Sequence, residues 1–333
     1  MLNKTENAIW VSWEKHRRSQ SLANKFGVPL FEFQRRNARW LSHPMSIIRT
    51  IMLLLNQRPK ILFVQNPSAF LTLLAIFLKP FFRYKLVVDA HNAGVYPSEP
   101  TYEKYRSFFT FMHRHADLTI VTNNILAVTI EKNGGVAAIL PDPLPDLNCS
   151  RKRDHKKDKK DNFIVTLVCS YASDEPYLEV FKAAAQFSDN IRIYVTGDDR
   201  KLTQGERELA RSNRVTLTGF LSEDDYIAQL CRSDSIMVLT KRNDCMVCGA
   251  YEAVSLEKPL ILSDSNILQM YFNKGCVFTS NETLKIYDAV LKMQRKLGNK
   301  QKDIKDLKKN LIAGWRYDFS NVCHMFENHK FDE

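Results

Sequence analysis

Two acidic side chains, Asp244 and Glu252, have the types and spacing in this sequence that best suit chemistry. The apolar, β-branched run at residues 236–239 predicts a buried strand of a parallel sheet, and the residues around Glu252 predict the helix after it. Ligands of open α/β sheets bind at the carboxyl edge of the strands, where a helix start presents N–H groups to an anion. The alternative is an ordinary βαβ unit whose acids are solvated.

Metal-binding patterns near these acids are weak. Cys245 and Cys248 form a Cys-x-x-Cys, which can bind zinc or support redox chemistry, but no second pair stands at ligand spacing. The adjacent acids at 198–199 and 224–225 lie beside turn signals, where helix capping and loop solvation account for them better than a metal does. The sequence therefore predicts no metal site.

Strands and helices alternate along the chain, which predicts a doubly wound parallel sheet in each half. No glycine-rich dinucleotide fingerprint follows the first strand. Strands are expected at residues 8–12, 28–33, 60–65, 85–89, 118–122, 163–169, 191–196, 215–218, 236–239 and 260–262, with helices at 17–26, 39–56, 68–78, 102–114, 123–132, 177–187, 202–211 and 222–232.

The chain of 333 residues is long enough for two domains with separate cores. Residues 151–162, RKRDHKKDKKDN, contain nothing that could enter a core and predict a solvated linker. We therefore expect Rossmann-like domains at 1–150 and 163–315. A helical tail at 316–333 could cross back to the first domain.

The net charge of +11 is concentrated near the N-terminus. Residues 1–88 contain 14 Lys+Arg and 3 Asp+Glu, and 14 − 3 = +11, so the remainder is neutral overall. This asymmetry predicts an anionic partner, such as a phosphorylated substrate, nucleic acid or an anionic lipid surface. No recognition helix, finger or RNA-binding signature accompanies the charge, so nucleic acid is not expected.

Two features bear on location. The first residues lack a basic start followed by an apolar core, so no signal peptide is expected, and the seven cysteines lack the density of a disulfide scaffold, which suits a reducing cytosol. The apolar segments 45–55 and 69–82 are too short to span a bilayer. Both are flanked by basic residues. One interpretation is a core helix or an amphipathic helix whose basic face is solvated, and the other is contact with anionic lipid.

The segment that contains Asp244 and Glu252 resembles the signature of family 4 GT-B glycosyltransferases. That family has Glu-x7-Glu followed by a pattern like Glu-Ala-x-x-x-Gly-x-Pro-Val-Ile, and residues 252–261 here read EAVSLEKPLI. Two positions depart from the pattern, because Asp244 replaces the first glutamate and Glu257 stands where glycine is usual. The resemblance implies two Rossmann-like domains that face a central cleft.

The first half is similar to the chitobiosyl-diphosphodolichol β-mannosyltransferases. Their Gln-Asn-Pro-Pro and Asp-Trp-His-Asn runs correspond to QNPS at 65–68 and DAHN at 89–92. Residues 219–226, GFLSEDDY, resemble the loop and helix that border the nucleotide base in such folds. The resemblance implies transfer of a sugar from a nucleotide donor to an acceptor that is often lipid-linked.

The resemblance also implies roles for individual residues. Glu252 would accept hydrogen bonds from the ribose, Asp244 would hold the donor sugar, and backbone N–H groups would meet the diphosphate. Positive charge would come from Lys241 and Arg242, because a metal-independent enzyme needs cations there. The predicted donor-binding residues are Lys241, Arg242, Asp244, Cys245, Met246, Val247, Glu252, Phe220 and Leu221.

Glu14 and His91 are the titratable groups best placed to take a proton from an acceptor hydroxyl. If the reaction inverts the anomeric centre, Glu14 is the expected base; if it retains, no base is required and His91 would contact the donor sugar. The alternatives are a Glu14 ion pair on a helix and a His91 satisfied by backbone. The predicted acceptor-binding residues are Trp13, His16, Arg17, Arg18 and Asn66.

The sequence thus predicts a metal-independent hexosyltransferase that uses a UDP- or GDP-sugar without a further cofactor. Its acceptor would be lipid-linked or a growing polysaccharide in cell-surface glycan assembly. The expected location is cytoplasmic, with peripheral contact to the inner face of the membrane. The alternatives are a GT-B sugar-nucleotide 2-epimerase and a non-catalytic partner protein that binds anions.

Overall fold

The computed structural model describes residues 7–33, 42–66, 68–95, 103–149 and 162–327. The chain divides into two compact units, Met1–Pro143 with Gly314–Glu333 and Leu144–Ala313. The charged segment expected as a linker lies outside the described residues, except for Asn162.

The first unit is built on a parallel sheet that has six strands within the described residues, in the order β2-β1-β3-β4-β5-β6. Its elements are β1 (Ala8–Ser12), α1 (Arg17–Phe26), β2 (Leu30–Glu32), α2 (Ser42–Gln57), β3 (Ile61–Asn66), α3 (Ala69–Phe82), β4 (Lys85–Ala90), α4 (Asn92–Val95), α6 (Arg106–His115), β5 (Leu118–Val121), α7 (Asn124–Lys132) and β6 (Ala137–Ile139).

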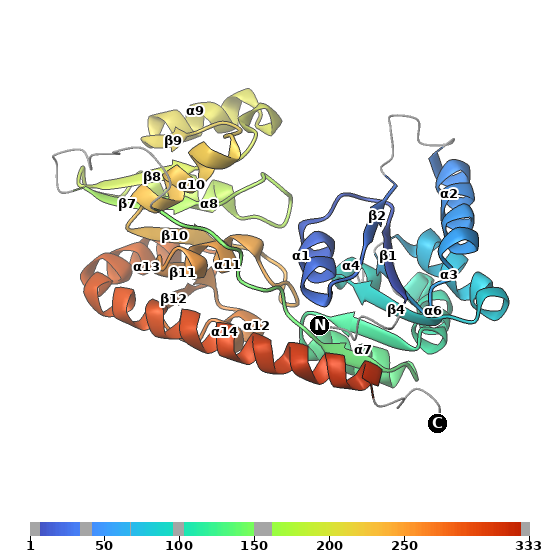
Figure 1. Cartoon of the computed structure of the whole chain (residues 1–333). Helices are drawn as coiled ribbons and strands as arrows, with labels where there is room; N and C mark the ends of the chain where they lie inside the picture. The colour runs from blue at the N-terminus through green and yellow to red at the C-terminus, as the bar shows by residue number, and fades with distance from the viewer. Residues whose placement is uncertain (1–6, 34–41, 67, 96–102, 150–161, 328–333) are drawn as a thin grey trace. The chain divides into compact units, whose positions relative to one another are not determined.

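Helices cover both faces of this sheet because successive side chains of a buried strand point to opposite faces. In β1, Ile9 and Val11 pack in the cluster that includes α2, α3, α6 and α7. Ala8 and Trp10 pack in the cluster that includes α1 and the last turns of the C-terminal helix (Figure 1). Every residue of β1 is buried, as the continuous apolar run predicts.

The second unit repeats this architecture with strands in the order β12-β11-β10-β7-β8-β9. Its elements are β7 (Phe163–Leu167), α8 (Tyr177–Ala184), β8 (Ile191–Val195), the 3-10 turn η1 (Asp199–Lys201), α9 (Gln204–Ser212), β9 (Val215–Leu217), α10 (Glu223–Arg232), β10 (Ser235–Val238), α11 (Cys248–Ser255), β11 (Leu260–Ser263), α12 (Asn266–Tyr271), β12 (Cys276–Thr279) and α13 (Thr283–Arg295). The last helix, α14 (Leu297–Glu327), begins in the second unit, and its residues from Gly314 onward belong to the first.

Both sheets are parallel throughout their described strands. Helices α8, α9 and α13 pack on one face of the second sheet, and α10, α11, α12 and the start of α14 pack on the other (Figure 1). The prediction of two doubly wound, Rossmann-like halves is confirmed. Because all strands run the same way, the loops that follow β7, β10, β11 and β12 leave from one edge of the second sheet.

Among the described residues, no helix combines the length and apolar character needed to cross a membrane. The structure differs from the expectation for cysteines at one place, because Cys149 and Cys231 form a disulfide bond. The two residues are 82 positions apart, so no local pattern marks them as a pair. The bond ties the segment after Pro145 to the end of α10 within the second unit.

Candidate functional site

The loop between β10 and α11 is held by neighbouring loops at the carboxyl edge of the second sheet. The Thr240 backbone N–H donates to Oγ of Ser263 at 2.9 Å, at the end of β11. Thr240 Oγ1 donates to Asp174 Oδ2 at 3.0 Å, and Asn281 Nδ2 donates to the Thr240 carbonyl at 2.8 Å. These bonds join the loops after β7, β10, β11 and β12. They fix the start of the loop that contains the predicted donor-binding residues.

Glu252 lies in the second turn of α11, where Tyr226 of α10 holds its carboxylate. The Tyr226 hydroxyl donates to Oε2 of Glu252 at 2.5 Å. This bond holds the carboxylate in one orientation. Tyr226 was not predicted as a site residue, although the loop and helix that contain it were; its spacing of 26 residues from Glu252 offers no local signal.

Arg242 and Asp244 pair with each other in the loop. Nη2 of Arg242 lies 3.2 Å from Oδ2 of Asp244, and both side chains are partly exposed. Lys241 is exposed, and its Nζ donates to the Ser173 carbonyl at 3.3 Å. The two predicted cations therefore differ in their partners. Arg242 is paired with a carboxylate, whereas the ammonium group of Lys241 is hydrogen-bonded to a backbone carbonyl.

The rest of the predicted donor loop is small and partly apolar. Cys245, Met246 and Val247 are half-buried, and α11 begins at Cys248 without a side-chain cap on its N-cap residue, Val247. Burial raises the pKa of the Cys245 thiol, which keeps it protonated and uncharged at neutral pH. Gly249 allows α11 to approach the sheet, because a Cβ there would lie 3.0 Å from Val168.

Phe220 and Leu221 follow β9 in the loop before α10. The Phe220 ring is 83% exposed, so a planar ligand can reach its face. The preceding Gly219 has φ +67°, a left-handed conformation that glycine adopts without steric cost and that turns the chain at this point. This arrangement suits an aromatic platform beside a nucleotide base.

The departure at Glu257 has a structural consequence. Glu257 follows the end of α11 with φ +57°, in the left-handed region where glycine is favoured. Its carboxylate accepts a bond from Nζ of Lys308 at 3.1 Å, which links the turn to α14. This position therefore has a backbone conformation that glycine adopts without steric cost.

We expect the Glu257→Gly variant to be more stable than the Glu257→Ala variant by about 1 kcal/mol, because alanine keeps the steric cost of the left-handed conformation. Both variants lose the bond to Lys308, so their difference in free energy of unfolding, measured by chemical denaturation, isolates the backbone term. The matched control is the exposed Lys285 in α13. There the Lys285→Ala variant should be more stable than the Lys285→Gly variant by about 1 kcal/mol. Equal stability of the two Glu257 variants would contradict the assignment.

In the first unit, Glu14, His16 and His91 lie at the carboxyl edge of the sheet. Glu14 is exposed in the turn after β1, and His16 caps α1 by accepting from the Arg18 N–H at 3.3 Å. The His16 and His91 rings are 4.2 Å apart between centroids. The predicted proton acceptors and His16 therefore belong to one region of this unit.

Burial lowers the pKa of His91 from 6.5 to about 4, with Arg18 and His16 acting in the same direction and Asp89 opposing them. His91 is therefore neutral at physiological pH. Its Nε2 is buried, and no described residue forms a hydrogen bond with it. A neutral ring of such low basicity is better suited to hydrogen bonding with a ligand than to removing a proton.

This pKa predicts a pH dependence of stability. A histidine with a lowered pKa in the folded state binds a proton more readily when unfolded, so its contribution is complete above pH 6.5 and is lost as the pH falls toward 4. The free energy of unfolding of the wild type should fall about 1–2 kcal/mol more between pH 7 and 5 than that of His91→Gln. Denaturation curves at each pH test this, with exposed His115→Gln as the control; parallel curves for wild type and His91→Gln would contradict it.

Three predicted acceptor-binding side chains lie inside the first unit and need correction. Trp13 is fully buried, with its Nε1 donating to Thr50 Oγ1 at 3.1 Å. Asn66 is buried and its Nδ2 donates to the Gly94 carbonyl at 3.1 Å. Both side chains are therefore buried rather than on the surface that an acceptor would meet, and Oδ1 of Asn66 has no hydrogen-bond partner among the described residues.

Arg18 is the third correction. Its guanidinium is buried and donates to Asp89 Oδ1 at 2.8 Å, to Asp142 Oδ1 at 2.5 Å and to the Leu140 carbonyl at 2.9 Å. These carboxylates raise its pKa against the opposing effect of burial. Arg18 therefore holds the unit together, and of the predicted pair only Arg17 is exposed.

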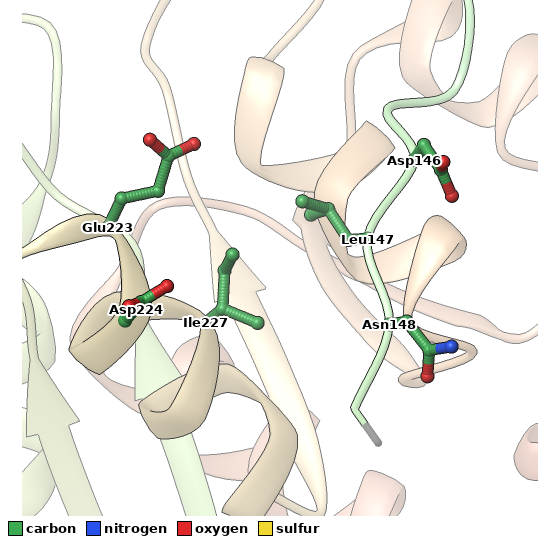
Figure 2. A pocket seen from close by; sticks show the side chains of 6 residues that line it. All are labelled: Asp146, Leu147, Asn148, Glu223, Asp224 and Ile227. Carbon is green, nitrogen blue, oxygen red and sulfur yellow. The ribbon is translucent and has the colours of Figure 1, made fainter. Parts of the chain in front are cut away.

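The second unit also contains a pocket of about 300 Å³ that the predicted donor residues do not line. Figure 2 shows the six side chains around it, from the segment after Pro145 and from α10: Asp146, Leu147, Asn148, Glu223, Asp224 and Ile227. Three of them are carboxylates, which repel an anionic ligand. This pocket is therefore a poor place for a diphosphate.

The adjacent acids lie at the starts of η1 and α10. Asp198 caps η1 by accepting from the Arg200 N–H at 3.2 Å, and Ser222 caps α10 by accepting from the Asp225 N–H at 3.2 Å. Among the described residues no cluster of three or more His, Cys, Asp or Glu could hold a metal ion.

The loop after β7 contains residues that the sequence did not single out. Glu175 accepts bonds from the backbone N–H groups of Ser170 and Ala172 at 2.9 and 2.8 Å, which closes this loop tightly. Asp174 anchors the neighbouring loop through Thr240. Their only sequence signal is a polar run after the first strand of the second half.

Comparison with known proteins supports the fold assignment. No protein-family model matches the chain, and no curated protein sequence does. HepE of Anabaena, in complex with UDP, has a similar structure, with a TM-score of 0.73 at 12% identity over 96% of this chain and 99% of that one. Sucrose-phosphate synthase from Thermosynechococcus elongatus has a TM-score of 0.71 at 14% identity, over 95% of this chain and 84% of that one.

A structure from Listeria monocytogenes assigned as a UDP-N-acetylglucosamine 2-epimerase is also similar, with a TM-score of 0.61 at 13% identity over 95% of this chain and 98% of that one. Identities this low show a shared fold. The two Rossmann-like units and these likenesses define the chain as a protein of the GT-B fold. The resemblance of the first half to chitobiosyl-diphosphodolichol β-mannosyltransferases has no counterpart in these comparisons.

Proposed function

We propose that the chain is a glycosyltransferase that moves a hexose from a UDP- or GDP-sugar to an acceptor. The observation that supports this most is the Glu252 carboxylate, oriented by Tyr226 at the carboxyl edge of the second sheet. Ligands of open α/β sheets bind at this edge, and an oriented carboxylate can accept both hydroxyls of a ribose. The nucleotide complexes of HepE concern a protein of the same fold.

The loop at 240–247 would bind the rest of the donor. The first N–H groups of α11 would meet the diphosphate, and Lys241 and Arg242 would balance its growing charge as it leaves, without a metal ion or other cofactor. Asp244 would accept hydrogen bonds from the donor sugar and exchange part of its pairing with Arg242 for them. Phe220 and Leu221 would lie against the base, with Cys245, Met246 and Val247 beneath the ligand.

The first unit would bind the acceptor. Glu14 is exposed and would remove the proton of the acceptor hydroxyl if the reaction inverts the anomeric centre. His91, neutral at physiological pH, would instead donate or accept a hydrogen bond to the sugar, and this role suits either stereochemistry. His16 and Arg17 would contact an anionic group of the acceptor.

We infer a lipid-linked acceptor or a growing polysaccharide, used in cell-surface glycan assembly on the cytoplasmic face of the membrane. The basic excess of residues 1–88 supports an acceptor that contains a diphosphate. A sugar-nucleotide 2-epimerase has no acceptor, so this alternative does not explain the basic excess of the first unit.

A donor screen followed by a product assay tests the proposal. A bound nucleotide sugar should raise the melting temperature by mass action, and one donor among UDP- and GDP-sugars should raise it most. That donor, labelled in its sugar, should then transfer the label to a lipid-diphosphate acceptor. Conversion of the donor to its C2 epimer without an acceptor would identify an epimerase, and stabilisation by every polyanion alike would identify an anion-binding protein.

A further inference from the structure

Helix α2 exposes a row of large apolar side chains to solvent. Met45, Ile48, Met52 and Leu55 are each at least half exposed. Their spacing of three, four and three residues places all four on one side of the helix. The opposite side packs on the first unit, and there it buries the polar Ser46 and Thr50 together with Leu54.

Helix α3 also exposes large apolar side chains, and the centroid of the Phe70 ring lies 5.0 Å from that of His43 at the start of α2. Phe70, Phe77 and Phe81 are each more than three-fifths exposed, while Leu71 and Ala75 pack inward. Helices α2 and α3 pack against each other and α3 packs against α6, on the same face of the first sheet (Figure 1). We call the seven exposed residues the α2–α3 surface: Met45, Ile48, Met52, Leu55, Phe70, Phe77 and Phe81.

The charged residues of the segment that contains the α2–α3 surface have one sign, although Lys79 pairs with Asp117 of a neighbouring segment, its Nζ 2.7 Å from Oδ2. Residues 42–88 contain no Asp or Glu, and their Lys and Arg residues are Arg49, Arg58, Lys60, Lys79, Arg83 and Lys85. Arg49 lies on α2 between the apolar positions, and Arg58 and Arg83 follow the ends of α2 and α3; all three are exposed. Such a surface repels cations and attracts anions.

We propose that the α2–α3 surface docks on an anionic phospholipid bilayer, with its apolar side chains at the boundary of headgroups and acyl chains. Amphipathic helices with basic residues lie in this plane without crossing the membrane. The charges argue against a second copy of the chain, because a two-fold interface would bring two copies of the same basic patch together. This inference does not depend on the proposed function.

The test is co-flotation of the full chain with phosphatidylcholine vesicles, with and without phosphatidylglycerol, in the absence of nucleotide. We expect binding to the anionic vesicles that weakens as salt is added. Each Lys or Arg near the surface contributes a factor of about five, so the triple variant Arg49→Gln, Arg58→Gln, Arg83→Gln should bind about 100-fold more weakly. The variant Ile48→Glu, Met52→Glu, Phe77→Glu should not float.

The matched control is Met270→Glu with Leu284→Glu, which replaces similarly exposed apolar residues of the second unit and should bind as the wild type does. Thermal melting of every variant separates lost binding from lost folding. The proposal is overturned if the wild type ignores anionic vesicles, binds phosphatidylcholine alone equally well, or retains binding in the Glu variant. It is also overturned if light scattering shows a dimer that this variant dissociates.

Discussion

Replacing Glu252 with alanine is expected to weaken donor binding by roughly 100-fold. Hydrogen bonds to a charged group contribute about 1.5–3 kcal/mol each, and a ribose offers two hydroxyls, so losing the carboxylate removes about 3 kcal/mol, or two factors of ten. Calorimetric titration with the best donor of the screen measures the change. Tyr226→Phe should have a smaller effect of about threefold to tenfold, because the carboxylate remains and loses only its orienting bond.

The matched control is Glu208→Gln, which changes an exposed glutamate of α9 in the same unit. It should bind the donor as the wild type does, and all three proteins should melt at similar temperatures without ligand. Unchanged donor affinity in Glu252→Ala would remove the main support for the proposed site. A transfer reaction that survived that change at the wild-type rate would place the donor elsewhere.

Replacing Arg18 with methionine is expected to destabilise the first unit by about 3–5 kcal/mol. The guanidinium is buried, and its removal leaves Asp89 as a buried carboxylate without its ionic partner. Asp142 is 27% exposed at its side chain and can be solvated, so most of the loss comes from Asp89. Chemical denaturation measures the free energy, and the melting temperature should fall by about 10 °C.

Two variants sharpen this result. Arg17→Met removes the same charge from the exposed neighbouring position and should change stability by about 0.5 kcal/mol or less. Adding Asp89→Leu to Arg18→Met should recover much of the loss, because a well-packed apolar pair can replace a buried ion pair. An Arg18→Met protein as stable as the wild type would show that the ion pair does not hold the unit together.

The sequence predicted the architecture of the two sheets. It also placed the predicted donor-binding residues after strand ends of the second sheet, and their role in binding stays a prediction. Continuous apolar runs such as residues 236–239 specify buried parallel strands, and the alternation with helical periods specifies a doubly wound sheet. Both signals are local, so they can be read without knowing what the segments contact. The position of Glu252 after a strand end follows from the same local order. The left-handed backbone at Glu257 could also be expected, because the pattern that residues 252–261 resemble has glycine at this position.

The tertiary structure alone decided which side chains are buried and which meet. Trp13 and Arg18 look like surface residues in a turn and a first helical turn, yet they lie in a core and in an ion pair with Asp142, 124 residues away. The bond between Tyr226 and Glu252 likewise joins two helices. Such pairings depend on how whole elements pack, because an arginine or a tyrosine is equally compatible with solvent and with a buried partner until the neighbouring elements are in place.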